Sequence, residues 1–137
     1  MVSSYTAIAQ SLDVNEDLVF ATNRVITGCT VTHTEGTPTF VLKRPGYYYV
    51  GFNGTGATNG VAGAVLVELL SNGTNVEGAT ASAYSGATTE PVNLSFSTII
   101  KVLPSCNCVD NAASLTIRNT GVASTFNNAN ITITKIC

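Results

Sequence analysis

The stretch Thr39-Phe40-Val41-Leu42-Lys43-Arg44-Pro45-Gly46-Tyr47-Tyr48-Tyr49-Val50 decides the fold of this sequence. Two runs of β-branched and aromatic residues flank a Pro-Gly pair, a pattern typical of two strands joined by a turn. Successive side chains of a strand point to opposite faces, so Tyr47 and Tyr49 lie on one face and Tyr48 on the other. One face lines the core. The other is exposed, covered by a partner subunit, or buried within the same subunit as in a central strand.

The same two-residue alternation continues through most of the chain. Strands are expected at residues 25–32, 38–42, 47–53, 61–70, 92–102, 114–118 and 129–136. Turn signals separate them at residues 35–36, 53–54, 59–60, 72–73 and 104–105. The one helical candidate is residues 5–12, a short run without a clear cap. About eight short strands without a βαβ rhythm predict an all-β fold, a jelly-roll β-sandwich in a single domain.

The composition excludes several classes of protein. Charged residues are 10% of the 137 residues, against about 25% in average proteins. The six Lys and Arg residues are scattered and the net charge is −2, so we expect no binding of nucleic acid. The longest apolar stretch, residues 61–70, is far shorter than the ~20 residues of a membrane span, so we expect no membrane partner. The N-terminus lacks the pattern of a signal peptide, which indicates synthesis in a cytoplasm.

The residues that carry chemistry are few. A Ser-His-Asp or Cys-His arrangement would have to use His33, the one histidine, and no nucleophile elbow accompanies it. No spacing selects a pair of carboxylates for glycosidase chemistry. The acidic group Asp13, Glu16 and Asp17 is interpreted as a solvated segment or a contact of an N-terminal arm, since it has no calcium-loop signature. We therefore expect no enzyme activity, no cofactor and no metal.

The cysteines leave three alternatives open. Cysteines stand at positions 29, 106, 108 and 137. The Cys106-Asn-Cys108 spacing lacks the two intervening residues that zinc sites prefer. Synthesis in a cytoplasm favours free thiols, one or two disulfides are the next alternative, and metal binding is the last. As the final residue, Cys137 is the candidate for a cross-link between chains.

Residues 39–50 resemble the strand-turn-strand core of C1q/TNF-like domains, in which a Gly-x-Phe strand is followed by Pro-Gly-x-Tyr-x-Phe. Residues 65–75, with their Ser-Asn-Gly turn, resemble a hairpin of that family, and residues 130–136 are similar to its terminal strand. The resemblance covers about residues 17–137. It implies a jelly roll in each subunit and a trimer packed around a threefold axis.

The opening of the chain is similar to short proteins encoded beside the capsid genes of phages and prophages. The similarity rests on residues 4–10, 14–20, 27–29 and 33–36. It implies a structural virion protein, a head decoration or head-fibre protein made in the bacterial cytoplasm, with the major capsid protein as its partner. Residues 1–16 would form an N-terminal arm that contacts the capsid, and residues 17–137 the jelly-roll domain. The residues predicted to form the interfaces of the arm and of the homotrimer are Tyr5, Ile8, Tyr47, Tyr48, Tyr49 and Phe52.

Two other functions share this fold. A bacterial surface or spore-coat C1q-like module would carry a Gly-X-Y segment upstream, and this sequence contains none. A carbohydrate-binding or receptor-recognition module would bind a host-surface glycan through aromatic side chains on loops. The only loop candidates for that role are Tyr84 and Phe126.

Overall fold

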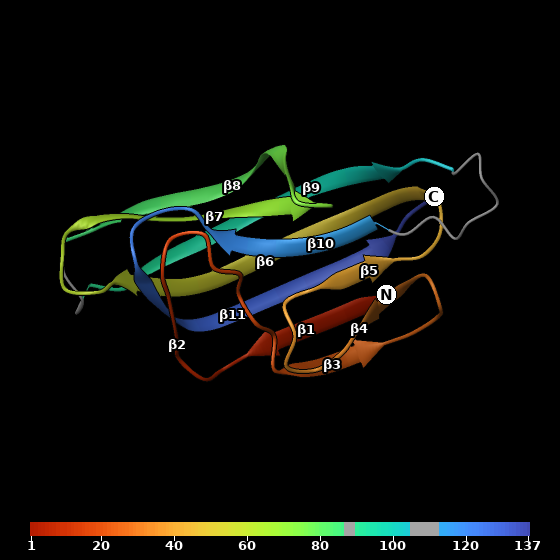
Figure 1. Cartoon of the computed structure of the whole chain (residues 1–137). Coiled ribbons are helices and arrows are strands. Elements are labelled where there is room, and N and C mark those ends of the chain that lie inside the picture. Colours follow the sequence, from red (N-terminus) through yellow and green to blue (C-terminus); the bar gives the residue numbers. More distant parts are fainter. Residues whose placement is uncertain (87–89, 105–112) are drawn as a thin grey trace.

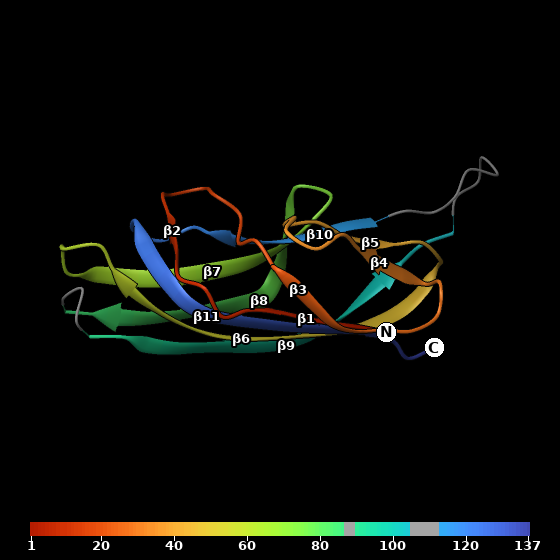
Figure 2. The ribbon, with the colours of Figure 1, turned by 90° about the horizontal axis from the view of Figure 1, so that it is seen from below.

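The computed structural model describes residues 1–86, 90–104 and 113–137, which form eleven β-strands and no helix. The strands make two stacked sheets, seen face on in Figure 1 and edge on in Figure 2. The first sheet has the order β3-β1-β11-β6-β9, with β2 paired to the start of β11, and the second has the order β4-β5-β10-β7-β8. Both termini lie at the same end of the sandwich (Figures 1 and 2). The predicted jelly-roll β-sandwich is confirmed.

The strands of the first sheet are β1 (Val2–Thr6), β2 (Gln10–Leu12), β3 (Thr22–Ile26), β6 (Gly46–Thr58), β9 (Val92–Val102) and β11 (Ser124–Lys135). Those of the second are β4 (Val31–His33), β5 (Phe40–Leu42), β7 (Gly63–Ser71), β8 (Thr74–Ser85) and β10 (Ala113–Asn119). Every strand pairing among the described residues is antiparallel. The β7–β8 hairpin turns at Asn72-Gly73, where both residues have positive φ (52° and 80°) as a tight two-residue turn requires.

The core lies between the two sheets and follows the alternation of the sequence. In β6, Tyr48, Val50 and Phe52 point inward, and in β9 the apolar residues predicted for one face, including Leu94 and Phe96, are buried. Residues from the second sheet, such as those of β7 and β10, close the core from the other side. Burying a side chain of this size contributes about 1.5–3 kcal/mol, so the inward-facing rows hold the sandwich together.

Two local predictions are wrong, and the one helical candidate is not a helix. Residues 5–12 form no helix, because β1 pairs with β11 and β3 and its alternate residues are buried. The expected strand at 25–32 is interrupted by a turn around Gly28, whose φ is +76°. The expected turn at Asn53-Gly54 lies inside the continuous strand β6. There Gly54 pairs with Ala129 next to a bulge in β11, and an added Cβ would meet the Asn128 carbonyl at 2.8 Å.

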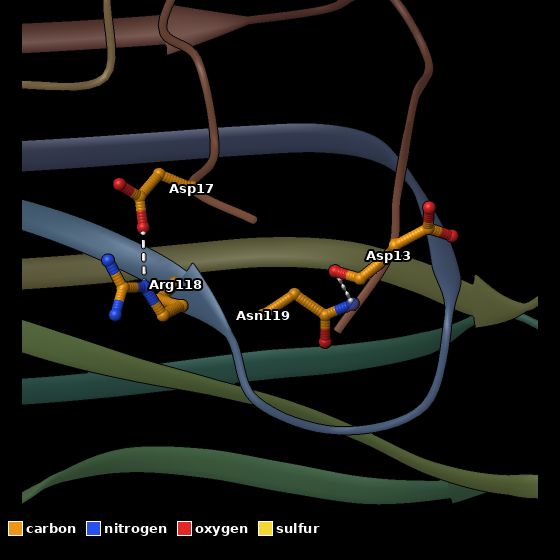
Figure 3. A network of polar contacts seen from close by, with 4 residues as sticks. All are labelled: Asp13, Asp17, Arg118 and Asn119. Carbon is orange, nitrogen blue, oxygen red and sulfur yellow. Dashed lines mark hydrogen bonds and ion pairs between the residues drawn. The ribbon is translucent and has the colours of Figure 1, made fainter. Parts of the chain in front are cut away.

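The predicted division at residue 16 does not describe this fold. Residues 2–6 form β1, which lies between β3 and β11, so the start of the chain belongs to the sandwich and is not a separate arm. The segment after β2 is fastened to β10 (Figure 3). Arg118 forms an ion pair with Asp17 at 2.9 Å, and the Asn119 amide donates to the carbonyls of Leu12 and Asp13. These contacts make one domain of the described residues.

Candidate functional site: the exposed face of the first sheet

The face of the first sheet that points away from the core carries large apolar side chains. We call it the tyrosine face and define it by Tyr5, Tyr47, Tyr49 and Ile99. Tyr47 is 43% exposed, Tyr49 38% and Ile99 58%. The register places Tyr49 between Ile99 of β9 and Thr134 of β11, so the apolar groups adjoin one another on one surface. Exposed apolar side chains gathered on one face indicate an interaction surface.

The charge on this sheet is low and has one sign. Among the described residues, its strands contain no aspartate or glutamate. The Arg24 guanidinium lies 4.7 Å from the centre of the Tyr5 ring, and the Lys101 ammonium lies 5.7 Å from the centre of the Tyr47 ring. Both contacts have cation–π geometry, which orders the tyrosine rings. The middle of the face is made of hydroxyl, amide and glycine residues.

Two of the predicted interface residues are wrong. Tyr48 is fully buried and Phe52 is almost so, because strand alternation turns both toward the core. The Tyr48 hydroxyl donates a hydrogen bond to the Arg44 carbonyl at 2.6 Å. Burial raises the pKa of this phenol against the opposing effect of the Arg44 charge, so it stays protonated and donates. Phe52 stacks on Phe96, with ring centres 5.4 Å apart.

The other predicted residues reach the surface in two places. Tyr5, Tyr47 and Tyr49 share the tyrosine face. Ile8 lies apart from them, in the loop between β1 and β2, and is 74% exposed. Sequence reasoning missed Ile99, although it is an apolar residue in the polar register of Ser97 and Lys101, which is a readable signal for an exposed apolar position.

A shallow cavity of about 440 Å³ opens in the middle of the tyrosine face. It is lined by Tyr49, Gly51, Phe52, Asn53, Ser95, Phe96, Ser97, Asn130 and Thr132. The Tyr49 ring reaches over Gly51, where an added Cβ would meet the Tyr49 hydroxyl at 2.8 Å. The Asn130 Oδ1 atom is buried and has no hydrogen-bond partner among the described residues. The cavity therefore combines an aromatic ring with uncharged polar groups, one of them unsatisfied.

The remaining candidates for chemistry lie elsewhere. His33 is buried between the sheets and not in this cavity. Cys29 and Cys137 are free and exposed, whereas Cys106 and Cys108 lie outside the described residues. Across residues 1–86, 90–104 and 113–137, no group of three or more His, Cys, Asp or Glu side chains is placed to hold a metal ion. The same residues contain no helix long and apolar enough to cross a membrane.

The two loop aromatics considered for sugar binding have opposite surroundings. Phe126 is fully buried in β11 and cannot contact a ligand, so this prediction is wrong. Tyr84 lies in β8 of the second sheet and is 71% exposed. It lies on a different sheet from the tyrosine face.

Solved structures with the same arrangement of strands establish the fold. The Eiger TNF of S. frugiperda matches 99% of this chain and 92% of its own, with 12% identity and a TM-score of 0.68. The fold of this chain is a TNF-like jelly roll. The PRD1 vertex protein P5 matches 99% of this chain and 72% of its own, with 13% identity and a TM-score of 0.58. Murine APRIL matches 98% of both chains, with 8% identity and a TM-score of 0.55.

At these identities the likeness is one of fold. No protein-family model matches the sequence, and no curated protein matches it.

Proposed function

We propose that this protein is a non-catalytic structural component of a phage virion, which assembles as a homotrimer and decorates the exterior of the capsid. It would be made in the bacterial cytoplasm and would bind the major capsid protein. The fold shared with a phage vertex protein supports a role in a particle. Low charge and the absence of a catalytic constellation in the sequence favour assembly over catalysis.

The tyrosine face is the observation that carries the proposal. Its exposed apolar groups lie on one side of a rigid sheet, which suits a subunit interface rich in tyrosine. Ile8, exposed in the β1–β2 loop, is the residue that we assign to the capsid contact.

The role in the particle is tested on purified virions. Mass spectrometry should find the protein in the particles, and labelled antibodies should bind intact capsids at their surface. Because several copies bind together, the trimer should remain attached although each contact is weak. Particles that lack the protein would refute the virion role.

Self-association is tested by paired substitutions. In sedimentation equilibrium the wild-type protein should be a trimer at micromolar concentration. Tyr49→Ser removes a half-exposed ring from the tyrosine face and should weaken association about tenfold or more, the effect of losing ~1.4 kcal/mol at an interface. Tyr84→Ser, the same change on an exposed residue of the second sheet, should leave association unchanged. A monomeric wild type, or equal effects of the two changes, would contradict this interface.

A second candidate function is suggested by the cavity. The Tyr49 ring above Gly51 offers an apolar platform, and the surrounding Asn53, Ser95 and Asn130 offer uncharged donors and acceptors. A neutral sugar has a face of C–H groups that can pack on the ring and hydroxyls that can bond to the polar groups. The cavity therefore suits a host-surface glycan. Asn130, whose buried Oδ1 atom has no hydrogen-bond partner among the described residues, lines the same cavity.

The two functions compete for one face and are separable by experiment. If the cavity binds glycan, Asn130→Ala should abolish saccharide binding on a glycan array while sedimentation still shows the oligomer of the wild type. If the face serves assembly alone, no neutral saccharide binds. In that case Tyr49→Ser affects only the oligomeric state.

A further inference from the structure

The single histidine of the chain lies where the two sheets meet at one edge of the sandwich. His33 ends β4 of the second sheet and is 8% exposed. Its ring stacks on Phe40 at 4.1 Å, with an angle of 11° between the rings, and meets the edge of Phe20. Its polar neighbours Ser4 and Asn23 belong to β1 and β3 of the first sheet.

Both ring nitrogens of His33 face oxygen atoms. Nε2 lies 2.8 Å from the Thr37 carbonyl, which can only accept a hydrogen bond. Nδ1 lies 2.5 Å from the Asn23 Oδ1 atom. The orientation of the Asn23 amide is fixed by a third contact, in which its Nδ2 donates to the His33 carbonyl at 2.9 Å. The oxygen of Asn23 therefore points at the ring as an acceptor.

This arrangement depends on the number of protons on the ring. A doubly protonated ring donates to Thr37 and to Asn23 at once, and the face of Phe40 lies beside its positive charge. A neutral ring has one N–H, so a lone pair of Nδ1 would meet a lone pair of Asn23 Oδ1. The contact is restored if the Asn23 amide turns over, which breaks its bond to the His33 carbonyl.

We propose that His33 and Asn23 form a pH-operated clasp between the two sheets. In the protonated state, Asn23 accepts from the His33 ring and donates to the His33 backbone. In the neutral state, Asn23 keeps one of these contacts and gives up the other. Ser4 follows the change, because its hydroxyl, which now donates to Asn23 Oδ1 at 2.5 Å, lies 3.5 Å from His33 Nδ1 and can turn toward it.

The surroundings of the His33 ring set the pH at which the clasp changes state. Burial lowers the pKa of His33 below its ordinary value, and the Thr37 carbonyl and the Glu35 carboxylate oppose this. Among the described neighbours, Ser4, Phe20, Asn23 and Phe40 bring no charge, and Arg24, next to Asn23, lies over the Tyr5 ring. The clasp should therefore change state at a pH below about 6.5, the ordinary pKa of histidine.

The experiment is a titration of the wild-type protein followed by NMR. The His33 ring resonances belong to the one histidine of the sequence, and the side-chain amide of Asn23 is read in the same spectra. The clasp predicts that the Asn23 amide moves with the midpoint of the His33 ring, below pH ~6.5. The side-chain amide of Asn119, which is bonded to Leu12 and Val122, should not follow that midpoint. An Asn23 amide that stays still while His33 titrates would overturn the proposal.

Glu35 is the competing explanation, because its carboxylate accepts from the Asn23 backbone N–H at 2.9 Å. Glu35→Gln removes this carboxylate and keeps a side-chain oxygen that can accept from the same N–H. If the clasp operates through His33, the Asn23 amide of this variant still titrates together with the ring. If the amide no longer responds, the response belonged to Glu35 and the clasp is refuted.

The free energy of unfolding should depend on the protonation of His33. Protonation adds the bond to Asn23, but the cost of burying the charged ring is the larger effect and holds the folded pKa of His33 below its ordinary value. Between the two values the unfolded chain therefore binds the proton more readily. The free energy of unfolding should therefore fall as the pH drops through about 6.5 and level off below the folded pKa. Urea titrations of His33→Gln should lack this step, and a step of equal size in that variant would contradict the assignment to His33.

Discussion

Tyr48→Ala is expected to lower the free energy of unfolding by about 3–5 kcal/mol, the usual cost of deleting a buried aromatic ring. Tyr48 is fully buried in the middle of β6, and its hydroxyl also holds the Arg44 carbonyl at the turn before this strand. The variant therefore leaves a cavity between the sheets and an unpaired carbonyl beside it. Urea denaturation followed by circular dichroism measures the change.

Two variants divide this loss into its parts. Tyr48→Phe keeps the ring and removes only the bond to Arg44, so about 1 kcal/mol should be lost. Tyr49→Ala removes the neighbouring ring, which points outward, and should change the stability of the isolated subunit by less than about 1 kcal/mol. If Tyr49→Ala proved as costly as Tyr48→Ala, the assignment of the two faces of β6 would be wrong.

The three tyrosines also mark the limit of what the sequence predicts. Alternation correctly separates Tyr48 from Tyr47 and Tyr49, because the period of a strand is two. It does not say which set faces the core, since that depends on the sheet packed against β6. Tyr48, Val50 and Phe52 alternate on one face of the same strand. The sequence pattern was therefore also compatible with burial of this row in the core.

Strand β8 could not be predicted for a different reason. It is an edge strand of Thr, Ala, Ser and Gly with few buried positions, so no apolar face marks it in the sequence. β1 is similarly polar, with Ser4 and Thr6 as buried members of the strand. Both strands form because their neighbours satisfy their backbone hydrogen bonds, which is a property of the assembled sheet.

The cavity of the candidate site could not be predicted either, because its residues come from strands far apart in the sequence. Gly51, Ser97 and Thr132 belong to three strands, and only the register of β6 with β9 and β11 sets them in one row. Asn130 lies opposite Asn53 and Tyr5 through pairings with β6 and β1. Sequence reasoning located the tyrosines of the face, and the cavity among them follows from strand register.

Asn119→Ala is expected to lower the free energy of unfolding by about 2–4 kcal/mol, because it leaves several buried polar groups without partners. The Asn119 side chain is fully buried, and its Nδ2 lies 3.1–3.3 Å from the carbonyls of Leu12, Asp13 and Val122. Its Oδ1 accepts from the Gly121 backbone N–H at 3.2 Å. This one amide joins the segment after β2 to the β10–β11 turn (Figure 3).

The neighbouring ion pair is the matched control. Asp17 and Arg118 fasten the same segment to β10 (Figure 3), but both side chains are partly exposed, at 24% and 32%. Asp17→Asn should therefore cost about 1 kcal/mol or less, because water screens such pairs. Amide exchange of residues 10–20 should quicken strongly in Asn119→Ala and little in Asp17→Asn. Equal losses in the two variants would mean that the segment is held by charge and not by the buried amide, and the start of the chain would then loosen in high salt.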